Sequence, residues 1–144
     1  MSRPPPPRLE DFPGRVTEIV RYGDLDPQNH VNNAVFATFF ESGRVTLFRD
    51  PANGLLVPGA NFVLARSEID FLRELRWPGT IEIGTGIAAI GRSSYTVAQA
   101  IFRDGLCAAT GRATIVLIDD ASRRPRPLPD DAVARLRQLT AHGA

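Results

Sequence analysis

The sequence contains no lysine, and all 17 of its basic residues are arginine. They are balanced by 16 acidic residues, which leaves a formal net charge of +1. A strongly basic surface is the usual mark of a protein that binds nucleic acid, so this near-neutral balance argues against that class of partner. Arginine suits phosphate groups, but a bias this uniform is more typical of genome composition than of a binding site.

Cysteine is nearly absent as well. The single Cys107 cannot form an internal disulfide, so nothing indicates an oxidising compartment. Cys107 lies in the segment LCAATG with no neighbouring histidine, which favours a small core residue over a nucleophile.

Long apolar runs are missing too. No run reaches the length of a membrane span, and the N-terminal segment MSRPPPPRLEDFPG has no apolar region of the kind found in signal peptides. We therefore expect a cytoplasmic protein with no membrane partner.

The composition that remains is that of one folded domain. The chain has 144 residues, of which 43% are hydrophobic and 23% charged, enough to bury a substantial core. Four consecutive prolines near the N-terminus can neither form a helix nor join a sheet. We expect a flexible, extended proline-rich arm over residues 1–14 and a single domain over residues 15–144.

The strongest periodic signal is a helix over residues 33–49. Its apolar positions recur at spacings of three and four, which predicts one broad buried face. Asn32 precedes it as a plausible N-cap. The apolar positions are Phe36, Phe39, Phe40, Gly43 and Leu47.

Alternating and β-branched segments predict five strands, over residues 15–23, 62–71, 80–90, 95–102 and 106–118. The strand over 62–71 is expected to have one covered and one mostly polar face. Gly84 and Gly86 share one face of their strand, which indicates that something packs very close to it. Asp104-Gly105 predicts a hairpin turn.

A short C-terminal helix is expected to be capped by Asp130 or Asp131. The resulting order is strand, long helix, four antiparallel strands and short helix. An apolar helix must be covered on most sides, so we predict an α+β fold in which the sheet curls around the long helix.

The loop DLDPQNHVNN before the long helix is unusually polar. Aspartate, proline and asparagine make turns and caps without any chemistry, and two aspartates with one histidine leave a metal site incomplete. The alternative is catalytic. A helix start has free backbone N–H groups that polarise a carbonyl oxygen, and a carboxylate folded back towards it, such as that of Asp26, can attack that carbonyl or activate water. Such an arrangement suits acyl transfer.

The segment YGDLDPQNHVNN, followed by an aromatic helix ending FFESGR, resembles the 4-hydroxybenzoyl-CoA thioesterase family of the hotdog fold. The likeness runs from about Val16 to Asp119, and the pattern DxDxxxHVNN is its most specific part. It implies a long central helix wrapped by a curved five-stranded antiparallel sheet. It also implies hydrolysis of an acyl-CoA thioester to free carboxylic acid and CoA, with no cofactor and no metal.

By this resemblance Asp26 is the catalytic aspartate, acting as nucleophile or general base. Asn33 matches the position whose backbone N–H polarises the thioester carbonyl. His30 either orients water or the thioester, or simply hydrogen-bonds the loop, and the resemblance leaves both roles open. Asp24 either raises the pKa of Asp26 or accepts hydrogen bonds within the loop.

Five further residues are candidate substrate-binding residues. For Asn32, a helix cap is favoured over a contact with the substrate. Phe36 fits either the core or an acyl pocket. Glu41 is of second rank, because it can also pair with Arg44 at a helical spacing of three. Ser93 and Ser94 resemble a turn near the pantetheine arm, although serines are common in hairpins.

The resemblance also implies an assembly. An exposed sheet edge is an aggregation liability, so we expect a homodimer joined edge to edge, which can pair further into a homotetramer. Two other functions remain open, because the fold is shared. They are an enoyl-CoA hydratase or dehydratase, which would use His30, and a non-catalytic module that binds acyl thioesters.

Overall fold

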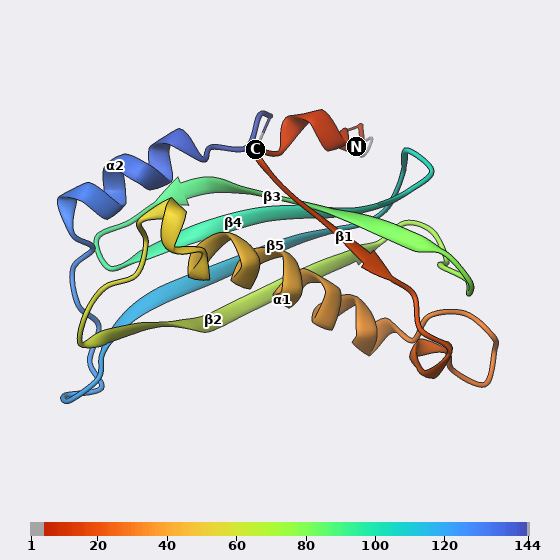
Figure 1. Ribbon diagram of the computed structural model, residues 1–144, viewed down its shortest axis with the longest axis horizontal. Helices are drawn as coiled ribbons and strands as arrows, with labels where there is room; N and C mark the ends of the chain where they lie inside the picture. Colours follow the sequence, from red (N-terminus) through yellow and green to blue (C-terminus); the bar gives the residue numbers. More distant parts are fainter. Residues whose placement is uncertain (1–4, 144) are drawn as a thin grey trace.

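Five antiparallel strands form one sheet that curves around a long helix (Figure 1). The computed structural model describes residues 5–143. The strand order is β1-β3-β4-β5-β2, with α1 lying against the concave face. The hotdog architecture expected from the sequence is therefore confirmed. The elements are β1 (Gly14–Ile19), α1 (Asn33–Arg49), β2 (Ala60–Phe71), β3 (Thr80–Ile90), β4 (Ser94–Arg103), β5 (Leu106–Asp119) and α2 (Asp130–Gln138), with 3-10 turns at Leu9–Asp11, Tyr22–Asp24 and Pro51–Asn53.

Helix α1 begins and ends where its periodicity predicts. The side chain of Asn32 accepts a hydrogen bond from the backbone N–H of Ala34 at 3.0 Å, so the predicted N-cap is confirmed. The three phenylalanines of the apolar face are all buried. Gly43 allows the helix to lie close to the sheet, because a Cβ atom there would come within 2.6 Å of the Ile83 side chain.

The opposite face of β3 explains its two glycines. A Cβ atom on Gly84 would lie 2.5 Å from the ring of Phe12, and one on Gly86 would lie 2.6 Å from the Cβ atom of Ala141. The close approach predicted for this face is therefore confirmed. The packing partners are the N-terminal segment and the chain after α2, and not the central helix.

This packing corrects the N-terminal prediction. Residues 9–11 form a 3-10 turn, and Phe12 is only 5% exposed. The backbone N–H of His142 also donates to the carbonyl oxygen of Asp11 at 2.8 Å. The extended arm was expected to reach residue 14, but it ends earlier. Burial of the aromatic side chain of Phe12 lowers the free energy of the folded protein and holds this segment against the sheet. Residues 1–4 of the predicted arm lie outside the described residues.

Two other boundaries differ from the prediction. Strand β1 ends at Ile19 and not at residue 23, because the Asp24 carboxylate accepts the backbone N–H of Arg21 at 2.8 Å and holds the following residues in a turn. The N-cap of α2 is Pro129. The two aspartates expected as caps occupy the first turn, where their negative charge interacts favourably with the helix dipole. The Asp104-Gly105 hairpin is confirmed, with φ angles of 51° and 76°.

Among residues 5–143, strand β2 is an edge strand that pairs only with β5. The pairing register shifts between Leu64 and Arg66, which interrupts the alternation predicted for this segment. Phe71, on the face expected to be covered, is 49% exposed, so that face is only partly covered within one subunit. No helix among residues 5–143 is both long and apolar enough to cross a membrane.

Candidate active site

The polar loop before α1 folds back on itself. The backbone N–H of Asp26 donates to the carbonyl oxygen of His30 at 3.0 Å, and the N–H of Asn29 donates to the carbonyl oxygen of Asp26 at the same distance. Asn29 has a φ of 66°, a left-handed conformation that asparagine tolerates better than most residues. This local reversal places the Asp26 and His30 side chains beside each other.

The loop is also fixed to its surroundings. The N–H of Val31 donates to the carbonyl oxygen of Leu75 at 2.8 Å, which ties the loop to the connection between β2 and β3. The N–H of Asn32 donates to the carbonyl oxygen of Asp24 at 2.9 Å. The Asp24 side chain is buried and bonded to Arg21, so this residue acts as an acceptor within the loop.

The Asp26 carboxylate is mostly buried, with 16% of its side chain exposed. Its Oδ1 atom accepts the N–H of Gln28 at 2.9 Å, and its Oδ2 atom lies 3.7 Å from Nδ1 of His30. One oxygen therefore holds the turn, and the other faces the imidazole.

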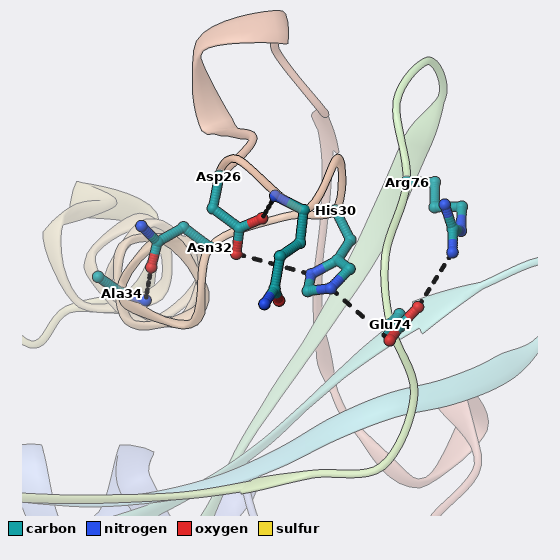
Figure 2. A network of polar contacts seen from close by, with 7 residues as sticks. Asp26, His30, Asn32, Ala34, Glu74 and Arg76 are labelled. Carbon is teal, nitrogen blue, oxygen red and sulfur yellow. Dashed lines mark hydrogen bonds and ion pairs between the residues drawn. The ribbon is translucent and has the colours of Figure 1, made fainter.

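His30 lies between two carboxylates (Figure 2). Its second ring nitrogen, Nε2, is 3.7 Å from Oε1 of Glu74, and Oε2 of Glu74 is 3.2 Å from the Arg76 guanidinium. Glu74 was not predicted from the sequence. It is 44 residues from His30 in the chain, and only the pairing of the loop with Leu75 brings it near, so no local signal could have identified it.

The start of α1 presents an unused backbone donor. The Asn32 side chain satisfies the N–H of Ala34, and the carbonyl oxygen of Asn32 accepts the N–H of Val35. Within residues 5–143, the N–H of Asn33 has no hydrogen-bond acceptor. The positive end of the helix dipole adds to its ability to bind a partial negative charge.

A pocket of about 360 Å³ opens beside this helix start. Its apolar part includes Phe36 and Phe71, whose rings meet edge to face at 5.1 Å. His30 and Asn33 contribute polar walls, whereas Asp26 is not among the lining residues and lies beside His30. The full lining is His30, Val31, Asn33, Phe36, Phe71, Leu72, Arg73 and Glu74.

The structure thus gathers Asp26, His30, Asn32, Asn33 and Phe36 at one place. Other predicted substrate-binding residues lie elsewhere within the subunit. Ser93 lies in the turn between β3 and β4 and Ser94 is the first residue of β4, at the opposite end of the sheet from the Asp26 loop (Figure 1). Glu41 lines a different pocket, near the C-terminal half of α1.

Within residues 5–143, no group of three or more histidine, cysteine, aspartate or glutamate side chains is arranged to hold a metal ion. Glu74 is instead bonded to Arg76, which already neutralises its charge.

Comparisons with known proteins agree with this architecture. The chain is 24% identical over 123 residues to the acyl-CoA thioester hydrolase YbgC of Escherichia coli O157:H7, covering 83% of this chain and 92% of that protein. A crystal structure of a thioesterase from Thermus thermophilus, complexed with coenzyme A and Zn, is 38% identical with a TM-score of 0.80, and the match covers 90% of this chain and 96% of that one. The PA5185 protein of Pseudomonas aeruginosa is 26% identical with a TM-score of 0.85, over 97% of this chain and all of that one (100%).

A family profile matches most of the chain. It covers residues 20–136, and it describes the thioesterase-like superfamily. The matched range includes the polar loop, α1 and the four strands that follow it. The chain therefore belongs to the thioesterase-like superfamily.

Proposed function

We propose that this protein hydrolyses an acyl-CoA thioester to a free carboxylic acid and CoA. The observation that carries the proposal is the grouping of a carboxylate, an imidazole and a free helix N–H beside one pocket. The printed names of its relatives support the same chemistry, since one is an acyl-CoA thioester hydrolase and another a thioesterase complexed with coenzyme A.

The start of α1 would polarise the thioester. A carbonyl oxygen placed in the pocket beside Asn33 can accept the unused backbone N–H of that residue. The bond strengthens as the oxygen gains negative charge in the tetrahedral transition state. The backbone is the donor, so the Asn33 side chain has only a minor part in this step.

Asp26 is better placed as a general base than as a nucleophile. His30 lines the pocket and Asp26 does not, so we assign the carboxylate to the activation of water and not to a direct attack on the carbonyl carbon. A water molecule would instead add to the carbonyl carbon while its proton passes to Asp26, directly or through His30. The C–S bond then breaks, and the CoA thiolate leaves and takes up a proton.

The Asp26 and His30 side chains are 3.7 Å apart, so proton transfer between them would require a closer approach. Catalytic contacts often shorten when the substrate is bound. The acyl group would contact Phe36 and Phe71, the apolar part of the pocket.

We also propose that two copies pair through β2. This strand has an unpaired edge, and Leu64 and Phe71 on it are each 49% exposed. A twofold pairing of two β2 edges would satisfy the backbone groups and cover these side chains. Phe71 also lines the pocket at the helix start, so a partner at β2 would border the proposed site.

The test of the function is thiol release from short, medium, long and aromatic acyl-CoAs, with Asp26→Asn beside the wild type. Asparagine keeps an oxygen for the N–H of Gln28 but loses the charge. We expect hydrolysis by the wild type and a loss of about 10²-fold or more in Asp26→Asn, as for removal of a general base. Asp120→Asn is the matched control, because Asp120 is exposed and its oxygen likewise accepts a hydrogen bond, from Asn61.

Unchanged turnover in Asp26→Asn would refute the proposed role. One observation also favours a second candidate, an enoyl-CoA hydratase, because an imidazole flanked by carboxylates suits the addition of water to a double bond. Crotonyl-CoA separates the two functions: loss of its double-bond absorbance without thiol release would assign hydration. Tight binding of acyl-CoA without either reaction would assign a binding module.

A further inference from the structure

The connection between β2 and β3, residues 72–79, forms one wall of the candidate active site. Three of its residues line the pocket beside the start of α1. Leu75 is buried and packs in the core cluster that contains Val31. Its carbonyl oxygen accepts the N–H of Val31, the residue directly after His30. The position of this connection therefore bears directly on the position of His30.

Arg103, the last residue of β4, is bonded to this connection and to the strand that follows it. Its Nη1 atom donates to the carbonyl oxygen of Arg76 at 2.6 Å, and its Nε atom donates to that of Thr80 at 3.2 Å. A Cβ atom on Gly79 would lie only 3.1 Å from Nη2, so the backbone passes close to the guanidinium. Nη2 is itself buried and has no hydrogen-bond partner within residues 5–143. The guanidinium thus bridges the connection and the start of β3.

Two other carbonyl groups of the connection hold the chain on either side of the polar loop. Leu75 accepts the N–H of Val31, and Gly79 accepts the N–H of Val20, directly after β1, at 2.9 Å. These two donors flank the turn that brings the carboxylate and the imidazole together. Each of the two carbonyl groups is one residue from a carbonyl group that Arg103 binds. A shift of the connection would therefore move both ends of the loop.

A side-chain path runs beside this backbone path. The Arg76 guanidinium is 3.2 Å from Glu74, and Glu74 faces His30 (Figure 2). The side chains of Glu74 and Arg76 are 59% and 65% exposed, and exposed ion pairs contribute little. The backbone path through Leu75 is therefore the stronger link between the connection and His30.

We propose that Arg103 is a positioning residue that fixes His30 beside the pocket. Arg103 is not among the residues that line the pocket, so it acts through the backbone of the connection. Displacement of a catalytic group by about 1 Å lowers a rate by about 10²-fold. The kinetic part of this inference rests on the proposed function, whereas the position of His30 is measurable without it.

The first measurement is the NMR spectrum of the imidazole groups in the full-length protein. The chain has two histidines, and His30→Ala identifies the signals of each. In Arg103→Ala we expect the His30 signals to shift by more than their linewidth, and those of His142 to keep their wild-type positions. Unchanged His30 signals in folded Arg103→Ala would overturn the proposal, whether or not the protein is a thioesterase.

The second measurement is thiol release from the acyl-CoA that the wild type cleaves best. We expect Arg103→Ala to lower kcat by about ten-fold or more and to leave KM within about three-fold, because Phe36 and Phe71 are not part of the connection. Methylguanidinium has the planar fork that bridges two carbonyl groups, so it should raise kcat of Arg103→Ala by about three-fold or more. Methylammonium should not. Absence of rescue, or equal rescue by both cations, would overturn the bridging role.

Arg135→Ala is the matched control. Arg135 lies on α2, and its Nε atom also donates to a backbone carbonyl oxygen, that of Asn53, at 3.2 Å. Urea unfolding should show both variants to be less stable than the wild type, but Arg135→Ala should keep kcat within about two-fold, because its contact lies outside the connection. An equal loss of kcat in the two variants would overturn the proposal.

Arg103→Lys carries the same test should Arg103→Ala not fold. Lysine keeps the positive charge, but a single ammonium group does not reproduce the planar fork of the guanidinium. We expect the His30 signals to shift and kcat to fall in this variant as well. Wild-type His30 signals together with wild-type kcat in folded Arg103→Lys would overturn the proposal.

Discussion

The carboxylate of Asp26 lies 3.7 Å from the imidazole of His30, four residues later in the same loop. Two backbone hydrogen bonds close the turn between them, so the relationship is built locally. His30 also lines the pocket, which Asp26 does not. We therefore propose that the histidine links the carboxylate to a ligand bound at the helix start.

Substitution of His30 should therefore lower turnover more than substitution of Glu74, the second carboxylate beside the imidazole. We expect His30→Ala to lower kcat by about 10²-fold, as for the loss of a group that handles a proton. Glu74→Gln should have less than a few-fold effect, because this side chain is 59% exposed and exposed ion pairs contribute little. Steady-state kinetics give kcat for both variants, and an equal loss of kcat in the two would contradict this prediction.

Two substitutions of Asn33 distinguish the role of its backbone N–H from the role of its side chain. Proline is well tolerated at the first position of a helix, and Asn32, with ψ at 137°, already has a conformation that suits a following proline. Asn33→Pro removes the N–H and should lower kcat by about 10²-fold, comparable to the loss of an oxyanion donor. Asn33→Ala keeps the N–H and should retain most of the activity. Similar rates for the two variants would rule out the backbone donor.

Leu64 tests the proposed pairing through β2. Leu64→Glu should convert a dimer to a monomer, because a twofold interface brings the same new charge from both copies to one edge. Sedimentation velocity measures the change. Leu106→Glu is the control, since Leu106 is similarly exposed at 52% but belongs to β5. A wild-type protein that sediments as a monomer would contradict the assembly itself.

Gly84 tests the packing of the N-terminal segment. In Gly84→Ala the new methyl group would meet the Phe12 ring, and we expect the free energy of unfolding to fall by about 1–3 kcal/mol. Gly23→Ala is the control, because within the described part of the chain no atom beyond its two sequence neighbours lies within 4 Å of a Cβ atom placed there. Urea unfolding measures both. In a Phe12→Ala background the effect of Gly84→Ala should shrink, and an undiminished effect would point to a different cause.

Cys107 should be unreactive in the native protein. Burial raises the pKa of its thiol, so the native state keeps the proton at pH values where the unfolded chain begins to lose it. The contribution of Cys107 to stability is therefore complete below the unfolded pKa and decreases as the pH rises above it. We expect a disulfide reagent to modify the native thiol at least about ten-fold more slowly than the thiol in urea. Equal rates would show that the thiol is accessible.

Local features of the sequence were sufficient for several parts of the structure. The bounds of α1, its Asn32 cap and the Asp104-Gly105 hairpin depend on contacts between residues two to four positions apart, and all three are confirmed. The proximity of Asp26 and His30 has the same origin, because a four-residue loop reversal brings them together. The family resemblance rests on this loop and helix, which is why it could be recognised before the fold was known.

Contacts between distant segments were decided only by the tertiary structure. Glu74 approaches His30 because Val31 pairs with Leu75, and Phe12 covers Gly84 because the chain before β1 crosses the back of the sheet. The spacing of Glu41 and Arg44 permitted an ion pair, but the fold buries Arg44 and leaves Glu41 exposed. Sequence spacing determines which side chains share a helix face or a loop. Only closure of the sheet around α1 determines which segments far apart in the chain meet, since those contacts depend on the packing of the whole core.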